Sequence, residues 1–459
     1  MKLGTRSKLV GWASLAALSL AFTAGCSGSG SGDDANSVED SLEIFSWWTN
    51  PGESEALTAL LDVYRQQNSG VDVTNAAATD PTNARQTLQT RLESGDPPDS
   101  FQAISGVDVM SWVSQGKMVP ITELSDKNGW ADIFPPVVTD ILTQNGDLYA
   151  VPVDIERDNN LYYNSALMQA HNVAPPQTLA DFYAACSTFQ SDKLTPVAMP
   201  AAGWVLALVA FETLMPTVNG GDYYLDFFNG DADPNGPELT TLFQEFAKVV
   251  ACSNVATASD SWGDAGDAVV NGNAAMIVMG DWMKGYFEGG QDAAGNARPV
   301  WTANQDFGVV PGLGSTGYYT FNSAVFGLPL GAQHPNAGKA FLTVAGSAAG
   351  QQAFNPLKGS VPARTDADLS LFDDMTRGSA MDFQAASVGT HKLLPGYASL
   401  TTLDFQEEIN PSLLVFAVGG DRARALDPTD VQEDEAQIPA LDIDYIVAKV
   451  AANYDLLKK

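Results

Sequence analysis

Short apolar segments alternate with amphipathic segments from residue 41 onward, and this order restricts the possible folds more than any other feature of the chain. Three segments are typical of strands: 41–47, 71–77 and the end of "GDPPDSFQAIS" at 95–105. Helices are predicted between them at Glu53–Gln67 and Pro81–Glu93, and the first has one apolar face, formed by Leu57, Leu60, Leu61 and Tyr64. This βαβαβ order predicts an α/β fold with a mostly parallel sheet and helices on both faces.

The later part of the chain continues this alternation with more helix. Thr178 and Asp181 have the spacing of a capping box and predict the start of a helix. A second helix is predicted over 237–252, with one apolar face made by Leu239, Leu242, Phe243 and Phe246. Further strands are predicted in 274–282, 306–311 and 324–329. Residues 41–459 exceed one ordinary domain and suit two.

The first residues have the composition of a targeting signal. Lys2, Arg6 and Lys8 precede the apolar stretch 9–25, whose core is shorter than the roughly 20 apolar residues of a membrane span. "TAGC" resembles a bacterial lipobox, so we predict a lipoprotein signal peptide over 1–25, lipidation of Cys26 and a flexible tether over 26–40. We therefore expect an extracytoplasmic protein anchored to the cell membrane. A plain secretory signal, cut nearby, is the alternative.

The net charge of the chain excludes some classes of partner. The chain has 55 Asp and Glu against 23 Lys and Arg, a formal net charge of -32. Such a surface repels nucleic acid and anionic ligands, so we expect neither as a partner.

The cysteines allow one disulfide. If Cys26 is lipidated, Cys186 and Cys252 remain, both expected late in helices. Outside the cytoplasm a remaining pair is typical of a disulfide, and we predict a Cys186–Cys252 bond.

Motifs of catalysis are missing from the sequence. His171, His334 and His391 show no metal-ligand spacing such as HExxH, and no GxSxG, Walker or GxGxxG motif is present. We therefore expect no enzyme activity, no cofactor and no metal site. A glycoside hydrolase with two acids far apart in sequence is the alternative, and motifs do not test it.

Tryptophans in polar or glycine-rich surroundings point to carbohydrate. Four of them have Ser, Asp, Gly or Asn neighbours: Trp47, Trp48, Trp262 and Trp282. The C–H face of a sugar packs on an aromatic ring, while its hydroxyls bond to carboxylates, amides and amines. For each single tryptophan, burial in a hydrophobic core is the alternative.

The chain resembles the extracellular solute-binding proteins of bacterial ABC sugar importers, in the maltose-binding-protein-like group. It is most similar to the members that bind glucose, galactose or mannose. The resemblance rests on five stretches in the family's order: "LEIFSWWT", "TRLESGDPPDSFQ", "YAVPVDIERDN", "MGDW" and "NPLKGSVPAR". It implies an α/β fold of the type II periplasmic-binding-protein kind, with two lobes and the ligand between them. Lobe one would comprise 41–153 and 322–356, and lobe two 154–321 and 357–459.

The resemblance also implies a set of sugar-contacting residues. They are Trp47, Trp48, Glu53, Gln102, Trp262, Trp282, Lys358 and His391. Since neighbouring strand residues point to opposite faces, we expect Trp47 and Trp48 to differ in role, one contacting sugar and the other supporting the wall. Ile104 replaces a basic or imidazole side chain of the relatives, and Ala324 replaces an acid. Glu156 and Asp158 either restore those polar contacts or form a hinge salt bridge with Arg157.

The resemblance thus implies a monomeric, lipid-anchored binding protein that delivers a glucose-like monosaccharide to the permease subunits of an ABC transporter by hinge closure. An oligosaccharide or polyol binder is the first alternative, and a relative that serves sensing would share the same sequence features. Trp48→Ala or Lys358→Ala is expected to abolish stabilisation by sugar while changing the stability of the sugar-free protein little.

Overall fold

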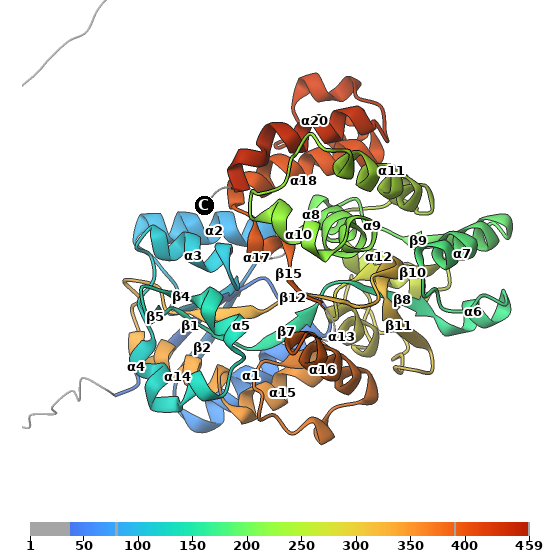
Figure 1. Cartoon of the computed structure of the whole chain (residues 1–459). Helices are drawn as coiled ribbons and strands as arrows, with labels where there is room; N and C mark the ends of the chain where they lie inside the picture. The colour runs from blue at the N-terminus through green and yellow to red at the C-terminus, as the bar shows by residue number, and fades with distance from the viewer. Residues whose placement is uncertain (1–36, 79–80, 390–391, 458–459) are drawn as a thin grey trace, which may run out of the picture. The chain divides into compact units, whose positions relative to one another are not determined.

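The first sheet brings together strands that lie far apart in the sequence. A computed structural model describes residues 37–78, 81–389 and 392–457 (Figure 1). The predicted signal peptide, Cys26, most of the tether and His391 lie outside these residues. The first sheet has the order β2-β1-β3-β13-β6. Its strands are β1 (Ser41–Ser46), β2 (Asp72–Ala77), β3 (Ser100–Ile104), β6 (Ala150–Pro152) and β13 (Ala324–Gly327).

The prediction of a parallel sheet is right for only part of this sheet. β1 pairs in parallel with β2 and β3, as the βαβαβ order requires. β13 returns from the later chain and pairs antiparallel with both β3 and β6, so the sheet is mixed. Helix α1 (Glu53–Gln67) has the predicted bounds and buries the four residues of its predicted apolar face. It packs mainly on α15 (Ala348–Lys358).

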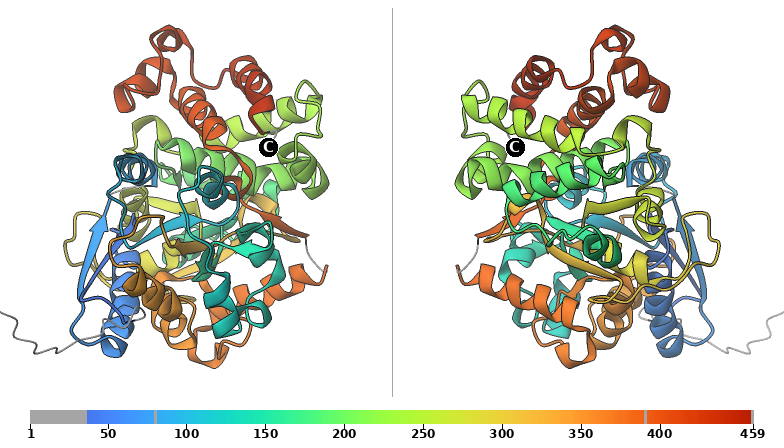
Figure 2. Two further views of the ribbon diagram at one scale, coloured as in Figure 1. Left: turned by 90° about the vertical axis from the view of Figure 1, so that its left-hand side faces the viewer. Right: turned by 90° about the vertical axis from the view of Figure 1, so that its right-hand side faces the viewer.

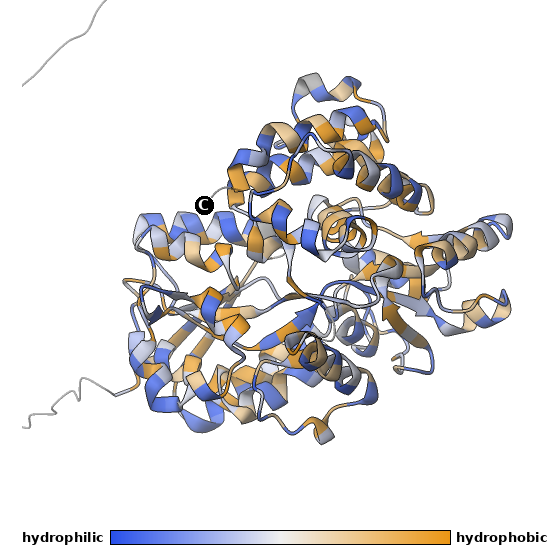
Figure 3. Ribbon diagram, in the orientation of Figure 1, coloured by the Kyte–Doolittle hydropathy of each residue, from blue (hydrophilic) through white to orange (hydrophobic). Residues whose placement is uncertain are grey.

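A second sheet has the order β11-β8-β10-β9 and its own hydrophobic core. Its strands are β8 (Asn160–Asn164), β9 (Thr195–Ala198), β10 (Ala274–Met279) and β11 (Phe307–Pro311). β10 pairs in parallel with β9 and antiparallel with β8, and all six of its residues are buried. In Figure 3 the surrounding helices show both hydrophilic and hydrophobic residues, as helices with one buried face do.

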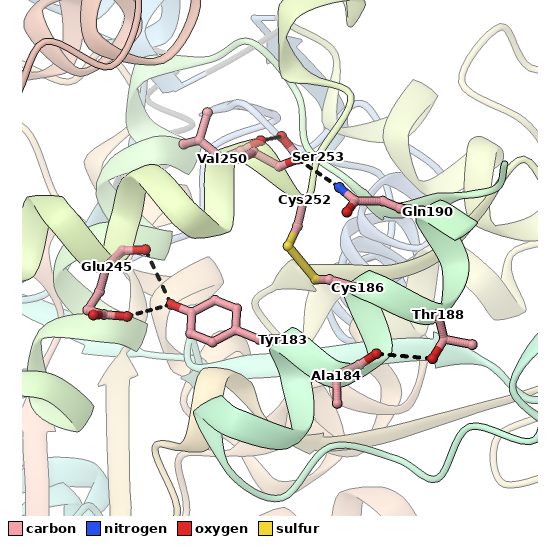
Figure 4. Close-up of a disulfide and its surroundings, with 10 residues drawn as sticks. Tyr183, Ala184, Cys186, Thr188, Gln190, Glu245, Val250, Cys252 and Ser253 are labelled. Atoms are coloured by element: carbon pink, nitrogen blue, oxygen red, sulfur yellow. Dashed lines mark hydrogen bonds between the residues drawn. A yellow bond between two sulfur atoms is a disulfide. The ribbon is translucent and has the colours of Figure 1, made fainter. Parts of the chain in front are cut away.

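Two helices of this region are joined by the predicted disulfide. The Thr178 hydroxyl accepts a hydrogen bond from the Asp181 N–H at 3.1 Å, so the predicted capping box opens α7 (Leu179–Ser191). Helix α11 (Pro237–Ala251) buries its predicted apolar face. Cys186 is bonded to Cys252, with 5.7 Å between their Cα atoms (Figure 4). Cys252 caps α11 as expected, whereas Cys186 lies in the middle of α7. Closing a loop of 66 residues stabilises a fold by about 4 kcal/mol in the chain-entropy model.

A third sheet, also of four strands, contains the strands that connect the first two sheets. Its order is β14-β7-β12-β15, with β7 (Asp154–Arg157), β12 (Tyr318–Asn322), β14 (Val361–Pro362) and β15 (Lys392–Pro395). β7 connects β6 of the first sheet to β8 of the second, and β12 leads back from β11 to β13. The predicted lobe boundaries at 153/154 and 321/322 fall at the start of β7 and within β12, whereas that at 356/357 falls near the end of α15. All three remain predictions.

The last helices pack on the second region of the chain. α18 (Leu403–Val418) contacts α8 (Gly203–Ala207), and α20 (Ile443–Asn453) contacts both α11 and α18. Figure 2 shows these red helices beside the green helices of the middle of the chain. Within the described ranges, no helix has both the length and the apolar character needed to cross a membrane. The same residues hold no cluster of three or more His, Cys, Asp or Glu that could bind a metal ion.

Candidate ligand-binding site

A cavity of about 110 Å³ is lined by residues from all three sheets or from the segments that follow their strands. From the first region come Trp47, Trp48, Asn50, Glu53, Arg85, Gln102, Ile104 and Ala324. The middle and the end of the chain contribute Glu156, Asp158, Trp204, Leu208, Glu212, Trp262, Trp282, Asn322, Tyr397, Ala398 and Gln406. Six of the eight predicted contact residues therefore line one cavity. Lys358 is bonded to residues of its wall, and His391 lies outside the described residues.

The two adjacent tryptophans differ in burial. Trp48 is 1% exposed, and its ring lies 4.8 Å from that of Phe354 and 5.8 Å from that of Phe326, measured between centroids. Trp47 is only half-buried, and its backbone N–H donates to Gln102 Oε1 at 3.2 Å. Trp48 is thus part of the core of the first region as well as of the cavity wall, whereas Trp47 is held by its backbone and keeps its ring partly exposed.

Glu53 is placed in the wall by the start of α1. Gly52, which precedes it, has φ of 85°, and a Cβ there would meet the backbone carbonyl carbon of Gly285 at 2.5 Å. Only glycine permits both this backbone conformation and the close approach. The first turn of α1 therefore lies directly against α13 (Trp282–Glu288), the helix that begins with Trp282.

Lys358 is a buried cation between two carboxylates and two aromatic rings. It is 1% exposed, and its Nζ lies 2.5 Å from Glu156 Oε1 and 3.7 Å from Glu53 Oε1. The ring centroids of Trp282 and Trp48 lie 5.1 and 5.9 Å from the same nitrogen. Burial alone would lower the pKa of Lys358, but the surrounding carboxylates, Glu156 first, raise it above its ordinary value. The pKa of Glu53 rises to about 7, because burial outweighs the effect of Lys358.

Three acidic side chains alternate along one crossing strand, in "DIERD". Asp154, Glu156 and Asp158 are spaced by two residues, so they share one face of β7 and its continuation. Asp154 Oδ1 accepts from the Ala324 N–H at 2.8 Å, and Asp158 Oδ2 accepts from Asn322 Nδ2 at 2.7 Å. Arg157 points elsewhere, to Asp382 Oδ2 at 2.7 Å. The alternative of a hinge salt bridge between Arg157 and its acidic neighbours is therefore wrong.

Asp158 belongs to a second acidic group in the cavity, together with Glu212. Glu212 comes from η3 (Leu208–Leu214), a π-helical stretch that follows α8, and its Oε1 accepts from the Tyr397 N–H at 2.7 Å. Both side chains are buried. Burial, followed by the charge of Glu212, raises the pKa of Asp158 well above its ordinary value. Burial also raises the pKa of Glu212, to about 7.

Sequence reasoning missed Glu212, Trp204 and Arg85. A signal existed for Glu212, which is the only charged residue in the apolar run "WVLALVAFETLM", because a carboxylate inside such a run is almost never buried without a partner. Trp204 also has a glycine neighbour, the signal that identified Trp262. The ring of Trp204 lies 6.3 Å from that of Trp282, measured between centroids. Arg85 is held by Asp108, with Nε and Oδ1 at 3.2 Å.

The two positions expected to differ from the relatives are neighbours in the first sheet. Ala324 on β13 pairs in register with Ile104 on β3, and both line the cavity. This part of the wall therefore offers no side-chain hydrogen bond to a ligand. Two donors elsewhere in the cavity, Gln102 Nε2 and Trp282 Nε1, are buried and make no hydrogen bond within the described structure.

Comparison with known proteins identifies a family and several relatives. A family model described as "Bacterial extracellular solute-binding protein" matches residues 59–381. An uncharacterized ABC transporter extracellular-binding protein of Pyrococcus horikoshii is 32% identical over 365 residues, which is 78% of this chain and 78% of that protein. A probable sugar-binding periplasmic protein of Mesorhizobium japonicum is 29% identical over 352 residues, which is 76% of this chain and 82% of that protein.

A solved structure shows the same fold. The bacterial solute receptor AcbH, described as preferring β-D-galactopyranose exclusively, superposes with a TM-score of 0.73 at 19% identity. The match covers 91% of this chain and 99% of that protein. The predicted two-lobe α/β fold is thereby confirmed.

Proposed function

Because this chain belongs to the family of bacterial extracellular solute-binding proteins, we propose that it binds a neutral, glucose-like monosaccharide in the cavity and delivers it to an ABC transporter. The supporting observation is the composition of the cavity wall. Tryptophan rings, buried carboxylates and buried amides face one small space. Rings of this kind pack on the C–H faces of a sugar, and the polar groups pair with its hydroxyls.

The size of the cavity supports a monosaccharide. Pockets for drug-sized ligands measure roughly 300–1,000 Å³, and this cavity measures about 110 Å³. A single hexose ring needs far less room than a chain of sugars, so the small volume favours one ring.

A neighbouring groove supports a second candidate, a binder of oligosaccharides. A larger groove of about 420 Å³ shares Arg85, Trp204 and Gln406 with the cavity. Its other walls are mostly polar and come from α2 (Pro81–Ser94) and the C-terminal helices. In this alternative, one terminal sugar fills the cavity and the following units extend into the groove.

The proposed delivery uses closure of the two lobes around the bound sugar. The crossing segments β7 and β12 would be the hinge, and closure would remove water from the cavity, so that hydrogen bonds and ring contacts strengthen together. The closed form would dock on the permease subunits. Lipidation at Cys26 would keep the binding protein at the outer side of the membrane, with the 26–40 segment as its tether.

A thermal-shift screen of the purified mature chain, 26–459, tests the proposal. D-glucose, D-galactose, D-mannose, maltose and raffinose are added at saturating concentration, and a bound sugar raises the melting temperature. We expect stabilisation by at least one hexose. Stabilisation only by maltose or raffinose would favour the oligosaccharide binder, and stabilisation by no carbohydrate would overturn the proposed function. Turnover of a chromogenic glycoside would instead identify a hydrolase.

A further inference from the structure

One end of the cavity contains two carboxyl groups that no cation neutralises. Asp158 is fully buried and Glu212 is 4% exposed. Within the described ranges, neither forms an ion pair with Lys or Arg, while Arg85, also in the wall, is bonded to Asp108. Lys358 is bonded to Glu156 and Glu53 instead.

Each of these carboxyl groups is fixed through one oxygen only. Asp158 Oδ2 is bonded to Asn322 and Glu212 Oε1 to the backbone of Tyr397. The other two oxygens, Asp158 Oδ1 and Glu212 Oε2, are buried and receive no hydrogen bond from another described residue. Both side chains line the same cavity, and the charge of Glu212 is one cause of the raised pKa of Asp158. Since a carboxyl oxygen accepts more than one hydrogen bond, the pair keeps acceptor capacity.

We propose that Asp158 and Glu212 form a subsite that accepts hydrogen bonds from hydroxyl groups of the sugar and excludes sugars with a carboxylate. This inference rests on the proposed function and identifies the residues that select the sugar. The cavity also has two donors that need an acceptor. Gln102 Nε2 and Trp282 Nε1 make no hydrogen bond to another described residue. A neutral sugar hydroxyl both donates and accepts and so satisfies both groups, whereas a uronic acid would place a further carboxylate beside the pair.

The subsite also explains how the cavity functions with Ile104 and Ala324 in its wall. These side chains make no hydrogen bond, so the sugar hydroxyls need acceptors from another element. Asp158 at the end of β7 and Glu212 on η3 supply them from the crossing strand and the second region. A buried hydroxyl without a partner costs about 1–3 kcal/mol, and this cost makes such acceptors selective.

Calorimetric titration of Asp158→Asn and Glu212→Gln tests the subsite. The probes are D-glucose and D-galactose, their monodeoxy analogues and D-glucuronate. For the wild type we expect no binding of D-glucuronate and a loss of about tenfold or more for one or two deoxy positions. Each variant should bind the parent hexose about tenfold more weakly than the wild type. For each variant, the deoxy sugar that lacks the hydroxyl contacting the altered residue should bind as tightly as the parent hexose does.

Combining each variant with each deoxy sugar distinguishes a residue that contacts the sugar from one that only supports the fold. Glu245→Gln on α11, whose carboxylate bonds to Tyr183 and Lys248 outside the cavity, is the matched control and should bind like the wild type. Variants that bind the parent hexose within twofold of the wild type, or that lose affinity equally for every deoxy analogue, would overturn the subsite. If the wild type binds no hexose at all, the proposed function fails, and the subsite with it.

Discussion

The cavity wall contains two groups of buried carboxylates, called its two ends here, and only one of them is paired with a lysine. At one end, Lys358 lies between Glu53 and Glu156, and its charge is further stabilised by the rings of Trp48 and Trp282. At the other end, Asp158 and Glu212 face the cavity together without a cation. Burial raises the pKa of carboxyl groups at both ends, but only the first end has a fixed positive charge to oppose it. The comparison indicates that the first end maintains the fold, whereas the second has capacity left for a ligand.

The largest effect is expected from removing the cation. Lys358→Met keeps most of the side-chain volume but leaves Glu156 and Glu53 buried without a partner. Breaking a buried ion pair in this way costs about 3–5 kcal/mol. We expect a loss of this size in the free energy of unfolding of the sugar-free protein, measured by urea denaturation at pH 8. The burial of Lys358 therefore replaces the sequence-based expectation of little change.

The control for this variant is pH. Glu53 becomes protonated as the pH falls below about 7, so the loss caused by Lys358→Met should be smaller at pH 5.5 than at pH 8. A loss below 1 kcal/mol at both pH values would contradict the assignment of Lys358 to the stability of this end.

The two tryptophans provide the next test. Trp48→Ala removes a ring that is 1% exposed and packed on Phe354, so we expect a loss of about 3 kcal/mol of unfolding free energy. Trp47→Ala removes a half-buried ring and should cost about 1 kcal/mol or less while still weakening sugar binding. Urea denaturation and calorimetric titration of both variants measure the two effects. Equal losses of stability would show that the pair does not divide its roles.

The end formed by Asp158 and Glu212 should make the free energy of unfolding depend on pH. The pKa of Glu212 is raised from 4.5 to about 7, so between these values the folded protein binds more protons than the unfolded chain. The free energy of unfolding therefore falls as the pH rises through this window and levels off above it. Glu53 contributes with the same sign. Glu212→Gln should remove about 2 kcal/mol of the decrease between pH 5 and pH 8, measured by urea denaturation.

A matched variant controls for general effects of charge removal. Glu245 is a partly exposed carboxylate whose pKa is lowered by Lys248 and Tyr183 despite some desolvation. Glu245→Gln should therefore not reduce the fall in unfolding free energy between pH 5 and pH 8. A wild type that is as stable at pH 8 as at pH 5, or an unchanged slope in Glu212→Gln, would contradict the unequal treatment of the two ends.

Local patterns predicted much of the fold, whereas Glu53 and Lys358 at the first end of the cavity were identified through the resemblance to the family. The apolar face of α1, the capping box of α7 and the cysteine pair depend on residues near in sequence or on simple counting, and the structure has all three. The strand β13 was predicted, but its antiparallel pairing with β3 was not, because the two strands lie more than 200 residues apart and no local pattern specifies their pairing.

Asp158 was considered as a replacement for the lost polar contacts, but its association with Glu212 was missed for a related reason. Asp158 and Glu212 are separated by 54 positions and come together only through the packing of η3 against the crossing strands. With 55 acidic residues in the chain, no spacing distinguishes this pair from any other. Glu212, as a lone charge in an apolar run, offered a signal that was not used.

The smallest effect is expected from giving the acidic end a cation. Ile104→His introduces an imidazole into the wall of the cavity that Asp158 and Glu212 also line. One added hydrogen bond contributes about 1 kcal/mol, so the Kd for the bound hexose should fall about fivefold. The gain should be larger at pH 6 than at pH 8, because the charged imidazole is favoured beside carboxylates. Ile104→Phe, a ring without nitrogen, is the control for size. If both variants change the Kd equally at both pH values, a missing positive charge does not distinguish this end from the one at Lys358.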